Sequence, residues 1–173
     1  MEVEWRPFEL HPEVPREGLP MDRLFPPERR ARAREQIDAM AREVGLRMEH
    51  SDRLINTRLA LGAAEFARER GKFEEMHHAL FAAHWEGTAR LDATADLRRI
   101  VGELGLDPGE LEDALASGRY EPVIDRHRAE AEAVGIDAIP AHIVGQRYLV
   151  VGAQPLAVFE QVLERIVSED TPA

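Results

Sequence analysis

The chain has 173 residues, of which 44% are hydrophobic, and this is sufficient for one packed domain. Its net charge of −11 disfavours binding to nucleic acid, because contacts to phosphates require clustered Lys and Arg. The absence of Cys excludes a disulfide scaffold, a Cys-ligated zinc site and a thiol nucleophile within these residues.

The first residues alternate apolar and polar side chains from Val3 to Phe8, and they predict a short strand that Pro7 interrupts. Four prolines and Gly18 then predict an extended loop. The sequence begins without the apolar run of a secretory signal, and no stretch approaches the roughly 18 apolar residues of a membrane span. We therefore expect a soluble, cytoplasmic protein without a membrane partner.

Apolar stripes at helical spacing predict six helices before Gly135. The second of them begins at a cap provided by Asn56 or Thr57, and Thr94 caps the fourth. Asp107 gives the clearest helix start, because a capping Asp is followed by Pro at the first helical position and by Glu three residues after the cap. The stripes of the first four helices consist of Ile37, Met40, Ala41, Val44, Leu59, Ala63, Phe66, Ala67, Phe73, Met76, Leu80, Ala83, Leu97, Ile100, Val101 and Leu104.

The pattern changes after Gly135. Two β-rich runs, Ala141 to Val144 and Arg147 to Val151, are separated by Gly145 and Gln146. A two-residue loop with Gly in first place predicts a type II′ hairpin turn. A last helix begins after Pro155, and its predicted inward residues are Phe159, Val162, Leu163 and Ile166.

Histidines are the residues that could indicate a metal site. Glu74 and His78 are four residues apart on a predicted helix, and His77 and His84 are nearby. Zinc sites usually require three or four converging ligands, and no second cluster is visible, so we expect no metal. The sequence also lacks a Gly-rich phosphate loop and a Gly-x-Ser-x-Gly motif, so we expect no cofactor. His142, at the start of the hairpin, is the histidine that we retain as a site candidate.

Several motifs together resemble the DsbA-like thioredoxin family. They are Trp5-Arg-Pro-Phe-Glu-Leu-His-Pro12, Asn56-Thr57, Leu80-Phe81, the segment from Gly135 to Pro140, and Tyr148-x-Val-x-Gly-Ala-Gln-Pro155. The resemblance extends from about residue 2 to residue 167. The branch that the chain resembles most is that of the cytoplasmic FrnE-type oxidoreductases, which are similar to 2-hydroxychromene-2-carboxylate isomerases and kappa-class glutathione transferases.

The resemblance implies an α/β protein with an incomplete thioredoxin-like fold and a large all-helical insertion. Residues 1–20 and 136–173 would form the thioredoxin-like part, and residues 21–135 would form the insertion and the connecting helix. Members of the family begin with a strand, a Cys-x-x-Cys or Ser nucleophile, and a helix. This sequence starts at what resembles the second strand, so we expect no catalytic residue within it.

The remaining site residues follow from the resemblance. Pro140 resembles the cis-proline of the family, and Ile139 the residue whose backbone pairs with an extended substrate. Asn56 resembles the Asn near the glutathione or substrate site of the isomerase branch. Together with His142, these residues are predicted to line a groove for a protein or thiol substrate. We also expect a cis Ile139–Pro140 bond at the entrance to the hairpin.

In a thioredoxin-like sheet the first strand is internal, and its absence would leave a slot between Val3–Arg6 and Ala141–Val144. Each unmade buried hydrogen bond costs about 1–3 kcal/mol. The two strands would therefore pair directly, the first would detach, or a second chain would fill the slot. A homodimer that completes the sheet is the arrangement we expect.

Three functional hypotheses remain open. The chain is a truncated DsbA-family thiol–disulfide oxidoreductase, a Cys-free thioredoxin-fold protein that binds without catalysis, or a truncated relative of the isomerases or kappa-class glutathione transferases. The coding sequence just before Met1 would discriminate between them. An in-frame strand followed by Cys-Pro-x-Cys supports the first hypothesis, a stop codon supports the second, and Ser in place of the first Cys supports the third.

Overall fold

The computed structural model describes residues 2–170. Contacts divide the chain into two compact units, residues 1–126 and 127–173, which we call the helical unit and the hairpin unit. The boundary falls within helix α6 (Glu121–Ala133). This mixture of helices and small antiparallel sheets confirms the expected α/β class. No helix in the described range is long and apolar enough to cross a membrane.

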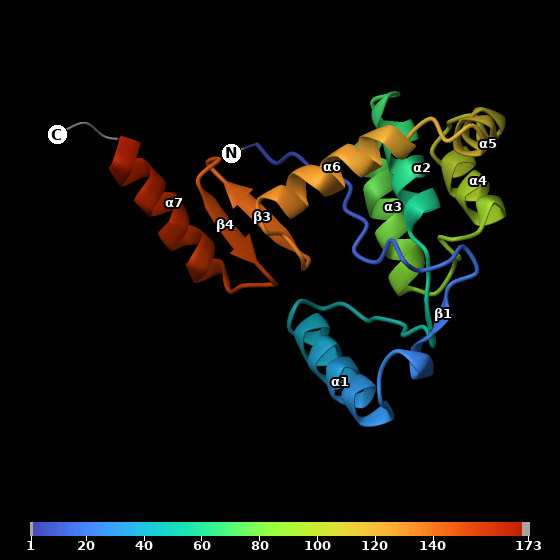
Figure 1. Ribbon diagram of the computed structural model, residues 1–173. Helices are drawn as coiled ribbons and strands as arrows, with labels where there is room; N and C mark the ends of the chain where they lie inside the picture. Colours follow the sequence, from blue (N-terminus) through green and yellow to red (C-terminus); the bar gives the residue numbers. More distant parts are fainter. Residues whose placement is uncertain (1, 171–173) are drawn as a thin grey trace. The chain divides into compact units, whose positions relative to one another are not determined.

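Four helices and the start of α6 enclose the hydrophobic core of the helical unit. Figure 1 shows α2 and α3 side by side, with α4 and α5 next to them. Phe66, Met76, Leu97, Leu111 and Ile124 are almost completely buried, so the apolar stripes predicted for this region do face inward. The four helices are α2 (Arg58–Arg68), α3 (Phe73–Trp85), α4 (Thr94–Glu103) and α5 (Pro108–Ala116).

The predicted helix starts differ in how they are capped. The Asp107 carboxylate accepts hydrogen bonds from the Gly109 and Glu110 amides at 2.7 and 3.3 Å, which confirms the predicted cap. At α2 the Asn56 side chain accepts from the Arg58 amide at 3.0 Å. Thr94, in contrast, is the first helical residue of α4, and no side chain caps that helix. The Thr94 prediction was wrong because the helix begins one residue earlier than its stripe indicates.

Helix α1 (Pro27–Glu43) is joined to the rest of the helical unit by a short ladder. Strand β1 (Leu19–Pro20) pairs antiparallel with β2 (Arg53–Leu54). The two ends of the segment that contains α1 therefore lie side by side. The sequence predicted α1 but neither strand, because two-residue strands are too short to show an alternating pattern.

The hairpin unit consists of β3 (Ala141–Val144), β4 (Tyr148–Val151) and α7 (Leu156–Asp170). The strands pair antiparallel from Ala141 opposite Val151 to Val144 opposite Tyr148, and α7 lies along them (Figure 1). The hairpin prediction is therefore confirmed. The turn type was wrong, because Gly145 and Gln146 both have φ of 59°, and positive φ at both central residues defines a type I′ turn. Leu163 was also predicted inward, but it is exposed.

The N-terminal segment does not form the predicted strand. Residues 2–9 have no strand assignment, and the carbonyl of Trp5 accepts a hydrogen bond from the Arg68 guanidinium at 2.7 Å instead. The Trp5 ring packs against His77 of α3, with centroids 4.4 Å apart. A side-chain donor and a tilted ring contact therefore hold this segment, in place of the strand partner that was expected.

Candidate substrate-binding site

The bond between Ile139 and Pro140 is cis, as predicted from the sequence. It directly precedes β3, and the Pro140 carbonyl accepts a hydrogen bond from the Gly152 amide at 2.7 Å. This bond ties the entrance of β3 to the end of β4. The Ile139 side chain is 51% exposed, so this corner of the hairpin is accessible.

One edge of β3 is unpaired. Within residues 2–170, β3 forms a two-stranded sheet with β4 alone, so the backbone groups along its other edge have no strand partner. Next to this edge, Ile143 is 57% exposed, and its cross-strand neighbour Leu149 is 43% exposed. An edge of this kind can accept an extended chain, whose backbone would complete the missing hydrogen bonds.

His142 lies on the other face of the hairpin from Ile143, because successive side chains of a strand point to opposite faces. Its ring packs edge-on against Phe159 of α7, with centroids 5.0 Å apart. The Nδ1 atom of His142 is buried and has no hydrogen-bond partner within the described chain. A buried polar atom without a partner is uncommon, and it leaves one donor or acceptor position available at this site.

Asn56 belongs to the helical unit, and both ends of its amide are engaged. Its side-chain NH₂ donates to the Val14 carbonyl at 2.6 Å, while its oxygen accepts from the Arg58 amide. Asn56 also lines a pocket of about 570 Å³, together with Thr94 and Tyr120. The hydrogen bonds show a structural role, in which Asn56 fixes the start of α2 to the preceding loop.

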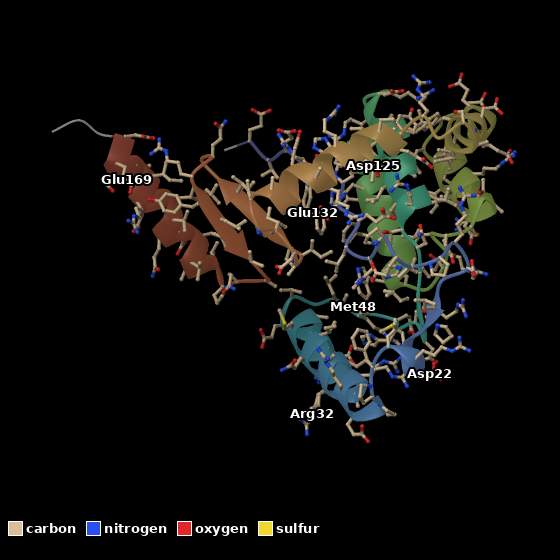
Figure 2. The ribbon with its side chains drawn as sticks, in the orientation of Figure 1. Asp22, Arg32, Met48, Asp125, Glu132 and Glu169 are labelled. Atoms are coloured by element: carbon tan, nitrogen blue, oxygen red, sulfur yellow. The ribbon has the colours of Figure 1, made fainter. Side chains whose placement is uncertain are left out.

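Arg58 is a prominent polar residue of this region that the sequence did not single out. Its guanidinium donates to Glu9 at 2.8 Å and to Asp125 at 2.7 Å, the latter on the first half of α6 (Figure 2). Burial lowers the pKa of Arg58, but the hydrogen bonds to Asp125 and Glu9 outweigh this effect and raise it overall. The guanidinium is therefore permanently charged. No local pattern could have predicted the cluster, since its members are far apart in the sequence.

The histidines of α3 pack among aromatic rings. His77 lies 4.4 Å from the Trp5 ring and 4.6 Å from the Phe81 ring. Burial lowers the pKa of His77, and the neighbouring His78 lowers it further. Among residues 2–170, no group of three or more His, Cys, Asp or Glu side chains is arranged to hold a metal ion.

The structure brings three of the four predicted site residues together in one unit. Ile139, Pro140 and His142 belong to the hairpin unit, and Asn56 belongs to the helical unit. The hairpin unit offers an open strand edge, exposed apolar side chains and one buried imidazole nitrogen. The strand edge and the exposed apolar side chains can bind an extended chain, but no Cys is present to attack a disulfide.

Comparison with known proteins agrees with this architecture. A family profile described as a DSBA-like thioredoxin domain matches residues 1–164. The chain belongs to this family. The DsbA-like chain is also 28% identical, over 173 residues, to the uncharacterized protein YwbO of Bacillus subtilis (strain 168). That alignment covers 98% of this chain and 82% of YwbO.

Solved structures show the same relationship for the DsbA-like chain. The crystal structure of the probable DsbA oxidoreductase SCO1869 from Streptomyces coelicolor has a TM-score of 0.86 and 26% identity to it. The match covers 99% of this chain and 78% of SCO1869. A structure from Nitrosomonas europaea has a TM-score of 0.64 at 16% identity, covers 85% of this chain and 78% of its own, and supports the fold alone.

Proposed function

We propose that this DsbA-like chain acts in thiol–disulfide exchange by binding an extended polypeptide along the unpaired edge of β3. The edge itself is the observation that carries the proposal, because its backbone groups have no strand partner within residues 2–170. The similarity to the probable DsbA oxidoreductase SCO1869 supports the same class of reaction. A FrnE-type branch and a cytoplasmic site of action, both expected from the sequence, belong to this proposal.

Recognition at such an edge combines two kinds of contact. Backbone hydrogen bonds hold any extended chain in register, and alternate side chains of the bound strand select its sequence. Every second side chain of that strand would lie on the face that carries Ile143 and Leu149, which are both exposed. A bound segment with apolar residues at alternate positions therefore fits this face best. Ile139 and Pro140 would receive one end of the segment.

The sulfur must come from outside residues 1–173. Only a thiolate attacks a disulfide, and the sequence has no Cys. We therefore expect the purified chain to leave the rate of insulin reduction at the level given by glutathione or dithiothreitol alone. An increase in that rate with the chain present would show that it catalyses exchange by a route without its own thiol, and it would overturn this part of the proposal.

Peptide binding tests the edge directly. A fluorescent peptide with alternating apolar residues should bind the chain, and Ile143→Asp should weaken binding by at least about tenfold, because a charge would face the apolar side chains. Val134 is the matched control, since it is 55% exposed in the same unit but lies outside the hairpin. Val134→Asp should leave the affinity unchanged. Equal effects of the two substitutions would contradict the assignment of the groove.

A non-catalytic binding protein is the second candidate, and the lack of any Cys favours it. Such a protein would bind its partner along the same edge of β3, but without any thiol chemistry. Peptides that contain a disulfide and peptides that lack one would then bind equally well.

The homodimer expected from the sequence would place a second copy of the chain on the same edge of β3. In that case peptide affinity should fall as the protein concentration rises, because a second copy would compete for β3.

A further inference from the structure

Helix α1 carries an apolar stripe that the rest of the helical unit leaves exposed. Ile37, Met40 and Val44 are 37%, 50% and 70% exposed, and their spacing places them along one side of the helix. The sequence placed all three on the apolar stripe of this predicted helix. Ala41, the fourth member of the predicted stripe, is buried, so the helix packs through an adjacent strip of its surface.

The packed side of α1 is held mainly by polar contacts. The Arg34 guanidinium donates to the Asp52 carboxylate at 2.7 Å, and the His50 Nε2 atom lies 2.7 Å from an Asp38 carboxylate oxygen. No other helix or strand of the helical unit makes extensive contact with α1 among the described residues. An exposed apolar stripe on a helix of this length is typical of a surface that binds another protein.

Charged and polar residues along one border of the stripe indicate what that protein is. Arg29, Gln36 and Glu43 are separated by seven residues each, so they form a row beside the stripe. All three are exposed, and the Gln36 and Glu43 side chains form no hydrogen bond or ion pair with the described residues. The guanidinium carbon of Arg29 lies 5.3 Å from the centre of the Phe25 ring. The row therefore has a positive end, a neutral centre and a negative end.

We propose that α1 binds α1 of a second copy of this chain in antiparallel orientation. A two-fold axis near Gln36 would place Arg29 of each copy opposite Glu43 of the other, and it would bring the two Gln36 side chains together. The same axis would place the apolar stripes of the two copies against each other, with Ile37 nearest the centre. Charge complementarity thus selects the antiparallel arrangement, because parallel helices would align like charges.

Geometry and symmetry agree with this arrangement. The 17 residues of α1 give a helix of about 25 Å, long enough for several turns of contact. An isologous two-fold contact is closed, so it yields dimers and not filaments. Leu46, just past the helix end, is also 61% exposed. An apolar centre with a charged border is the usual composition of such an interface.

Charge reversal tests the proposal with the full 173-residue chain. Sedimentation velocity over a range of concentrations should show a monomer–dimer equilibrium. Arg29→Glu would place carboxylates opposite each other, and Glu43→Arg would do the same with guanidinium groups, so each should weaken the dimer by about tenfold or more. The double variant restores both pairs and should recover the original affinity. An equimolar mixture of the two single variants should form heterodimers, which a single-copy effect on folding cannot explain.

Two further variants separate this surface from others. Met40→Asp should abolish the dimer, while Glu35→Arg should leave it intact, because helical spacing places the exposed Glu35 on the side of α1 opposite the stripe. Figure 2 shows α1 with its side chains. A chain that stays monomeric at its highest soluble concentration would overturn the proposal. A dimer that tolerates the α1 variants but is lost with Ile143→Asp would also overturn it, in favour of the β3 edge. Circular dichroism should confirm that every variant retains its helices.

Discussion

Arg58 and Glu9 form an ion pair of 2.8 Å in which the Glu9 side chain is only 3% exposed. The same guanidinium binds Asp125 at 2.7 Å, so one side chain of α2 holds both the N-terminal segment and α6. A carboxylate that is removed from water is unfavourable unless a partner compensates its charge. The position of the N-terminal segment in the helical unit therefore depends on Arg58.

Replacing Arg58 with Met should destabilise the helical unit by on the order of 3 kcal/mol, because Glu9 would remain buried without a partner. Urea unfolding followed by circular dichroism measures this change. Arg16→Met is the control. Arg16 is an exposed arginine, and like Arg58 it lines the pocket of about 570 Å³ described above for Asn56. It should change the free energy of unfolding by less than about 0.5 kcal/mol. A small effect at Arg58 would show that Glu9 finds water or another donor.

Two phenylalanines with different exposure test the core. Phe66 is completely buried in α2, and Phe81 is 55% exposed on α3. Phe66→Ala should lower the free energy of unfolding by about 3–5 kcal/mol, because it removes apolar burial and leaves a cavity. Phe81→Ala should cost less than about 1 kcal/mol. Similar losses for both variants would mean that α3 also buries its outer face.

Two glycines with nearly equal backbone angles separate conformational strain from steric contact. Gly18 has φ of 71° and Gly45 has φ of 73°, so alanine at either position should cost about 1 kcal/mol from the backbone alone. A Cβ atom at Gly18 would also lie 2.7 Å from the Leu54 carbonyl oxygen, whereas nothing lies within 4 Å at Gly45. Gly18→Ala should therefore be clearly more destabilising in thermal unfolding, because β1 and β2 must move apart. Equal melting temperatures would contradict this.

The stability of the helical unit should fall in mild acid. Burial, assisted by His78, lowers the pKa of His77 from its ordinary value of 6.5. Burial also lowers the pKa of His84. The unfolded chain then binds more protons than the folded one as the pH falls below 6.5, so the free energy of unfolding decreases until the folded-state pKa is passed.

His77→Phe removes one of these groups and keeps a ring between Trp5 and Phe81. The variant should lose less stability than the original chain between about pH 7.5 and pH 5, as measured by urea unfolding at both values. Phe81→Leu, which changes the ring beside His77 but removes no titratable group, is the control and should leave the pH dependence as it is. An unchanged pH dependence in the His77 variant would show that His77 protonates without cost.

Local signals account for what could be predicted from the sequence. The Asp107 cap and the stripe through Phe66 each specify a helix through neighbours a few residues away, and both are observed. The cis bond at Pro140 was predicted from its place between a helix end and a hairpin, as the family resemblance implies. For the candidate site, the sequence thus predicted the cis Ile139–Pro140 bond directly before β3.

Predictions failed where a distant partner decides the structure. Alternation from Val3 to Phe8 indicates a strand, but without a strand beside it the segment is fixed by Arg68. Periodicity in α1 indicates an apolar face, but it does not indicate whether this chain covers that face. The bond between Glu9 and Arg58 joins residues that no local pattern connects.

The weak attachment of α1 makes this helix the part of the helical unit that should unfold locally most easily. The helix is joined to the α2–α6 core by the two-residue strands β1 and β2 and by ion pairs such as Arg34–Asp52, in which Asp52 is largely exposed. Exposed ion pairs contribute about 0–1 kcal/mol each, and salt screens them. The amides of α1 should therefore exchange with solvent while those around Phe66 remain protected. Higher ionic strength should therefore make α1 detach more often, whereas the hydrophobic core of α2–α6 stays folded.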